Sequence, residues 1–260
     1  MMIDCILMAG GVPQESGLLY EYTQGSPKAL LDVAGKPMVQ WVIDALERAP
    51  SVREIILVGL DQEDGITSPK ITHTLPNLGS MLKNIIAGVD KVLEISPGAR
   101  QVLMCSADIP LLTAGMVEAL IAQCTDATVD IYHSIVPRER MEARFPASRR
   151  SYVHFREGDF AAGDIHVIAP HIAHTYADLW DGLLNDRKDA MKQAMRLGPA
   201  FFAKLLARRL SLTELEQRVL QKFGINVRVL AVDYPEMGMD ADKPFQLEIC
   251  RRELANRRTQ

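Results

Sequence analysis

The feature that most constrains the fold is a regular alternation of short apolar runs with stretches of helical periodicity over the first 125 residues. The apolar runs have the length of strands and lie at residues 3–8, 54–59 and 101–106. The helical patterns that follow them lie at residues 37–49, 79–94 and 113–123. This alternation is typical of parallel strands joined by crossover helices. It predicts an α/β fold with a mostly parallel central sheet and helices on its faces.

The pattern changes after residue 125. Strand-like stretches that we expect to extend the sheet lie at residues 128–136, 151–155, 164–168 and 226–232. Residues 171–223 have helical periodicity and are comparatively basic, and Ser211 and Glu214 have the spacing of a capping box. We predict that residues 1–260 form a single domain, in which residues 171–223 are a helical insertion or lid. A last helix is expected over residues 243–255.

Composition and charge exclude several classes of protein. With 29 basic and 33 acidic side chains, the net charge of −4 argues against binding nucleic acid by phosphate neutralisation. No run reaches the roughly 18 apolar residues of a membrane span, and the N-terminus has no secretory signal pattern, so a cytoplasmic location is expected. The cysteines have no paired spacing, which favours buried thiols over a zinc site or disulfides, at Cys5, Cys105, Cys124 and Cys250.

A glycine-rich turn follows the first strand, at Ala9, Gly10 and Gly11. Glycine lets the backbone approach a ligand closely, and a run of exposed amides can cradle phosphate oxygens. Two glycines after a strand are often only a turn. The functional interpretation gains weight from Lys28, because a lysine near the carboxyl edge of the sheet can reach a triphosphate.

Carboxylates occur at two further positions that we expect at the same edge. Asp108 directly follows the apolar strand at residues 101–106, and Asp240 and Asp242 lie just before the last helix. One or two carboxylates are typical of Mg²⁺ sites, where phosphate and water oxygens fill the other positions. Each aspartate alone could be a helix cap or a turn residue, so the interpretation depends on all these elements together.

These motifs together resemble the nucleotidyltransferase superfamily, whose GT-A-like, Rossmann-type members include molybdenum cofactor guanylyltransferase and sugar-phosphate nucleotidylyltransferases. The resemblance covers residues 3–125 and the last 30 residues, and covers the middle poorly. It implies a transferase that moves a nucleoside monophosphate from a nucleoside triphosphate to a small phosphorylated acceptor. Pyrophosphate would leave, with Mg²⁺ as the cofactor.

The resemblance also implies roles for individual residues. Lys28 and Asp108 would be catalytic, and Asp108 and Asp242 would hold Mg²⁺. The nucleotide would be bound at its phosphates and base by Ala9, Gly10, Gly11, Gly79 and Ser80. Gly163 and Asp164 would meet the acceptor.

One departure from the family pattern concerns the glycine-rich loop. Members of the superfamily usually carry an arginine shortly after the glycines, yet no Arg or Lys lies between Gly11 and Lys28. Either a cation comes from elsewhere, with Lys36 and the basic helical segment as candidates, or the chain is a catalytically weak or silent nucleotide-binding relative. A nucleotide-sugar glycosyltransferase is the third hypothesis, because that fold also binds metal through an aspartate after a central strand. The sequence does not identify the base or the acceptor, and residues 171–223 could shape the acceptor site or form a homo-oligomer interface.

Overall fold

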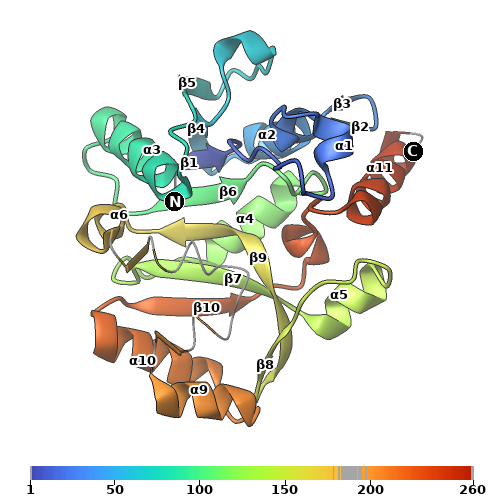
Figure 1. The fold of residues 1–260 in the computed structure, drawn as a ribbon. Helices are drawn as coiled ribbons and strands as arrows, with labels where there is room; N and C mark the ends of the chain where they lie inside the picture. The colour runs from blue at the N-terminus through green and yellow to red at the C-terminus, as the bar shows by residue number, and fades with distance from the viewer. Residues whose placement is uncertain are drawn as a thin grey trace.

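The chain is described from a computed structural model that places residues 2–177, 179–180, 182, 192, 195–196 and 198–258 (Figure 1). The strands are β1 (Ile3–Met8), β2 (Asp32–Val33), β3 (Lys36–Pro37), β4 (Val52–Val58), β5 (Ile71–Leu75), β6 (Val102–Ser106), β7 (Ile131–Pro137), β8 (Val153–Phe155), β9 (Gly158–Ile168) and β10 (Val227–Ala231). The α-helices are α1 (Tyr20–Thr23), α2 (Met38–Arg48), α3 (Met81–Ile95), α4 (Ala114–Gln123), α5 (Arg138–Arg144), α6 (His171–Thr175), α9 (Pro199–Leu206), α10 (Leu212–Phe223) and α11 (Pro244–Arg258). Short 3₁₀ turns are η1 (Lys28–Leu30), η2 (Gln62–Asp64) and η3 (Pro235–Gly238).

One large sheet organises the molecule, with the strand order β10-β7-β9-β6-β1-β4-β5 and with β8 paired to β9. The pairs β1–β4, β1–β6, β4–β5 and β7–β10 are parallel, whereas β9 is antiparallel to each of its neighbours. The predicted α/β fold with a mostly parallel sheet is therefore confirmed. Because β1, β4 and β6 run in the same direction, the loops that follow them meet at one edge.

Helices cover the central strands on both sides (Figure 1). Alternate residues of β1 face opposite layers: Cys5 and Leu7 pack with the buried side chains of α2 and α4, and Ile6 packs with those of α3. All three β1 side chains are fully buried. This two-sided burial is the physical reason for the continuous apolar runs in the sequence.

The structure differs from the prediction in the middle of the chain. Helix α5 forms where a polar, basic connection was expected, because its residues are good helix formers and one of them, Met141, is fully buried against the core. Strand β9 begins at Gly158 rather than at residue 164, since it first forms a hairpin with β8. Strand β5 was not predicted, because its alternating Thr-His-Thr sequence is only half buried.

The predicted helical segment at residues 171–223 lies partly outside the described residues. Its described helices include α9 and α10. They share a small apolar cluster with Leu210, which lies between them, and with Phe155 of β8. The capping box of α10 is confirmed, since the Glu214 amide donates to Ser211 Oγ over 3.1 Å. That the segment is an insertion or lid of a single domain stays a prediction. Within the described ranges, no helix is long and apolar enough to cross a membrane.

A stacked histidine pair joins β7 to β9 and gives a prediction about pH. The rings of His133 and His166 lie 4.4 Å apart, and burial lowers the pKa of His133 to about 4 and that of His166 well below its usual range. Unfolded histidine, with a pKa of about 6.5, binds protons more readily, so acid favours the unfolded state. We expect the free energy of unfolding to fall as the pH drops from about 6.5 toward 4.

The measurement is chemical denaturation across that pH range. Replacing His133 and His166 by Gln should flatten the dependence, whereas replacing His171, an exposed side chain, should leave it in place. An unchanged dependence in the double variant would contradict the prediction.

Candidate active site

Backbone hydrogen bonds fix four separate segments at the carboxyl edge of the sheet. The amide of Ala9 donates to Val58 over 2.8 Å, and the amide of Ala107 donates to Met8 over 3.0 Å. The amide of Lys28 donates to the Gly11 carbonyl over 2.8 Å, and the amide of Ala241 donates to Asp108 over 2.9 Å. The glycine-rich turn, η1, the loop after β6 and the segment before α11 are thereby held together. The parallel topology predicted this for the loops after β1 and β6.

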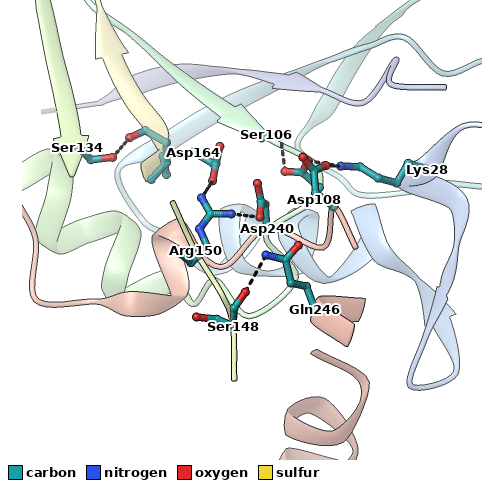
Figure 2. A network of polar contacts seen from close by, with 11 residues as sticks. Lys28, Ser106, Asp108, Ser134, Ser148, Arg150, Asp164, Asp240 and Gln246 are labelled. Carbon is teal, nitrogen blue, oxygen red and sulfur yellow. Dashed lines mark hydrogen bonds and ion pairs between the residues drawn. The ribbon is translucent and has the colours of Figure 1, made fainter. Parts of the chain in front are cut away.

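Lys28 lies between two of the predicted aspartates, Asp108 and Asp242, and Figure 2 shows its contact with Asp108. Its Nζ is 2.5 Å from Asp108 Oδ2 and 2.5 Å from Asp242 Oδ1, and Ser106 Oγ donates to Asp108 Oδ1 over 2.6 Å. The Lys28 side chain is only 13% exposed. Burial alone would lower the pKa of Lys28, but the two carboxylates raise it above its ordinary value. The lysine is therefore a fixed positive charge in this site.

The carboxylates of Asp108 and Asp242 converge on one cation, which is the arrangement a bound metal requires. Carboxylate oxygens are the donors that Mg²⁺ prefers. The described part of the chain contains no cluster of three or more His, Cys, Asp or Glu side chains that could hold a metal ion. Two protein carboxylates fit Mg²⁺ when phosphate and water oxygens complete the octahedron, so the residues present fit the cofactor implied by the resemblance.

The glycine-rich turn is supported by two asparagines that sequence reasoning missed. Asn77 Nδ2 donates to the Gly10 carbonyl over 2.7 Å, and Asn77 Oδ1 accepts from the Gly79 amide over 3.0 Å. Asn84 Nδ2 donates to Asn77 Oδ1 over 3.0 Å. Gly79 has φ +76°, a conformation that favours glycine, and Ser80 directly precedes α3. These bonds place the predicted base-binding segment beside the predicted phosphate-binding turn.

A second set of charged side chains adjoins the first. Arg150 forms a close ion pair with Asp240, and its Nη2 lies 3.9 Å from Asp164 Oδ2 (Figure 2). Burial, together with the charges of Asp108 and Asp242, raises the pKa of Asp240 to about 6. Burial and the charges of Asp240 and Asp108 raise the pKa of Asp164 well above its usual range. Arg150 was missed because it lies in the poorly matched middle of the chain.

Two groups of cations were considered as replacements for the missing loop arginine, and the structure places each of them relative to the site. Lys36 forms an ion pair with Asp44 and lies 3.8 Å above the Trp41 ring. Helices α9 and α10, from the basic helical segment, lie beside β10 at the opposite side of the sheet from β1 (Figure 1). Arg150, in contrast, lies within the acidic group that includes Asp108. It is therefore the second buried cation of this site.

Gly163 has a packing role that explains its residue type. A Cβ atom at this position would lie 2.2 Å from Ser134 Oγ and 3.0 Å from the Ser134 carbonyl oxygen. Ser134 is fully buried, and its hydroxyl donates to the Ile165 carbonyl over 2.6 Å, so it has little room to move. The predicted contact of Gly163 with an acceptor stays a prediction, as does that of its neighbour Asp164.

Replacing Gly163 by Ala should destabilise the protein by about 1–3 kcal/mol, the usual cost of overpacking a core. Chemical denaturation of the variant would measure this change in the free energy of unfolding. Gly115 in α4 is the matched control, since a Cβ there would meet nothing within 4 Å and alanine favours a helix. Equal effects of the two substitutions would argue against the packing role.

Comparison with known sequences identifies the family. The MobA-like NTP transferase domain matches residues 5–222. The chain belongs to this family of nucleotidyltransferases. The predicted superfamily is thereby confirmed.

Curated relatives of the family match part of the chain. The molybdenum cofactor guanylyltransferase of Rhodopseudomonas palustris (strain HaA2) is 30% identical over 130 residues, which are 48% of this chain and 56% of that protein. The corresponding enzyme of Bradyrhizobium sp. (strain ORS 278) is 26% identical, over 48% of this chain and 57% of that protein. The bifunctional protein GlmU of Thermoanaerobacter pseudethanolicus (strain ATCC 33223 / 39E) is 28% identical, over 36% of this chain and 21% of that protein. The chain thus spans between 21% and 57% of the length of these relatives.

Solved structures share the fold over nearly the whole chain. A hypothetical transferase from Thermus thermophilus is 31% identical, has a TM-score of 0.80, and the match covers 95% of this chain and 100% of that one. A CMP:2-keto-3-deoxy-manno-octonic acid synthetase in complex with CTP is 18% identical and has a TM-score of 0.63. This match covers 99% of this chain and 100% of that one. The second likeness shows the fold alone.

Proposed function

We propose that this family member transfers a nucleoside monophosphate from a nucleoside triphosphate to a phosphorylated acceptor, with Mg²⁺ as cofactor and release of pyrophosphate. The observation that carries the proposal is the convergence of Asp108 and Asp242 on one cation beside the glycine-rich turn. This arrangement lies at the carboxyl edge of the sheet, where open α/β folds bind ligands.

The chain's own residues would act by positioning and by charge. The Gly10 and Gly11 amides would hold the triphosphate, and Lys28 would move from the carboxylates to the phosphates, where its fixed charge offsets the charge of the leaving pyrophosphate. Asp108 and Asp242 would hold Mg²⁺, which when bound neutralises phosphate charge and orients the phosphate oxygens. An acceptor oxygen attacks the α-phosphorus, and the bond from that phosphorus to the β-phosphate oxygen breaks.

The test begins with a thermal-shift screen of ATP, CTP, GTP, UTP and dTTP with Mg²⁺. A ligand at 100 times its dissociation constant adds about 2.7 kcal/mol to the free energy of unfolding, so a specific triphosphate should stand out. Pyrophosphate release is then measured with that triphosphate and a panel of phosphate esters. Turnover of a nucleotide sugar without pyrophosphate release would favour a glycosyltransferase instead.

A catalytically silent nucleotide-binding protein is the second candidate, and one observation favours it. Residues 12–27 contain no Arg or Lys, so the loop has no basic side chain of its own for the leaving group. If the protein is silent, calorimetry would detect tight binding of a triphosphate. The pyrophosphate assay would then detect no release with any phosphate ester of the panel.

A further inference from the structure

Three buried polar atoms without a hydrogen-bond partner lie in one part of the molecule. Among the described residues, the buried side-chain nitrogen and oxygen atoms without a hydrogen-bond partner are Arg150 Nε, Asp164 Oδ2 and Gln246 Oε1. Buried polar atoms are nearly always paired, so each unpaired atom requires an explanation. Here the three belong to side chains of a single group, shown together in Figure 2.

Independent contacts hold these three side chains in the same group. Arg150 contacts Asp164 and Asp240, as described above. Gln246, in α11, is only 2% exposed, and its Nε2 donates over 3.2 Å to the carbonyl of Ser148, two residues before Arg150. That bond leaves the amide oxygen of Gln246 free, and Figure 2 shows this oxygen turned toward the side of Asp240 and Asp108.

The chemistry of the three atoms indicates what they can bind. Arg150 Nε is a donor, whereas Asp164 Oδ2 and Gln246 Oε1 accept, so the group offers one donor and two acceptors. A hydroxyl both donates and accepts, and two neighbouring hydroxyls would satisfy all three atoms. A phosphate group would not satisfy the two acceptor atoms, because it brings mainly acceptor oxygens at neutral pH. The charge of Arg150 is already balanced by its ion pair with Asp240.

We propose that Arg150, Asp164 and Gln246 form a subsite that binds a hydroxylated, uncharged part of the acceptor and so select the acceptor by its hydroxyls. The inference rests on the proposed function, because it assigns the acceptor side of the same site. Arg150 and Gln246 are then residues that determine specificity for the acceptor. The phosphate of the acceptor is then bound outside this subsite.

The experiment uses binding as well as turnover. Glucose 1-phosphate, mannose 1-phosphate and glycerol 3-phosphate are the hydroxylated probes, and phosphocholine is a phosphate ester without hydroxyls. With the responding triphosphate and Mg²⁺ present, at least one hydroxylated ester should bind in calorimetry and phosphocholine should not. Gln246→Leu should weaken binding of that ester about 10-fold or more, the loss expected for one hydrogen bond in a buried site. The affinity of the Gln246→Leu variant for the triphosphate should equal that of the unsubstituted protein.

The matched control is Gln101→Leu. Gln101 is also buried, at 7% exposure, and its Nε2 also donates over 3.2 Å to a backbone carbonyl, that of Asp126, but it lies before β6 at the other edge of the sheet. Equal weakening by the two variants, equal binding of phosphocholine, or no binding of any hydroxylated ester would overturn the subsite. Binding of an ester without pyrophosphate release would overturn the proposed function and leave the subsite standing.

Discussion

Replacing Asp108 by Asn should reduce pyrophosphate release by about 100- to 1000-fold, which is typical when one charge-stabilising group is removed from an active site. The substitution keeps the shape of the side chain and removes its charge. Asp108 is expected to hold Mg²⁺ together with Asp242, and the Ser106 hydroxyl fixes its orientation. The rate is measured with the triphosphate that responds in the thermal-shift screen.

The structure offers a matched control for this substitution. Asp44 also pairs with a lysine, Lys36, but that pair joins β3 to α2. Asp44→Asn should therefore leave pyrophosphate release within a few-fold of the starting protein. Normal turnover in the Asp108 variant, with its fold intact by circular dichroism, would contradict the metal assignment.

Replacing Lys28 by Met should destabilise the protein when Mg²⁺ is absent. The substitution leaves two carboxylates close together without their shared cation, and we expect a loss of about 2 kcal/mol in the free energy of unfolding. This is less than a fully buried pair would lose, because the Asp242 side chain is 34% exposed. Chemical denaturation without metal measures the loss.

Adding Mg²⁺ without nucleotide should restore much of the stability of the Lys28 variant and change the unsubstituted protein little. In the unsubstituted protein the ammonium group competes with the metal for the same carboxylate oxygens. Lys36→Met serves as the control and should gain nothing from Mg²⁺. If Mg²⁺ stabilises the unsubstituted protein as strongly as the Lys28 variant, Lys28 and the metal do not compete for one position.

The central strands could be predicted from sequence because their physical requirements are local. Strand β1 has the predicted bounds and β6 differs by one residue at its start, since both are short apolar runs buried on two sides. Parallel topology then places the loops after them at one edge, which explains why the position of Asp108 could be anticipated. Strand β5 lacks such a pattern. Helix α5 has helix-forming residues, but the burial of Met141 against the core depends on the folded chain.

The contacts within the site could not be predicted, because they join distant parts of the chain. Lys28 is 80 residues from Asp108 and 214 from Asp242, and a sequence alone does not say that an ammonium group will lie between them. The partnership of Arg150 with Asp240 spans 90 residues. Asn77 could have been noticed as a turn residue. Its bond to Gly10, however, depends on β5 lying beside β4 and on β4 lying beside β1.

Because β9 runs in the opposite direction to β6, two distant parts of the chain reach the site from opposite sides. Cys105 of β6 pairs with Ile165, so the preceding residue of β9, Asp164, reaches the site from the opposite chain direction. The β8–β9 hairpin pairs with neither β1 nor β6 through its turn, so we expect changes in its turn to leave the loops after β1 and β6 in place. Under the proposed function, a change of acceptor would then require changes near β9 while the glycine-rich turn keeps its contacts.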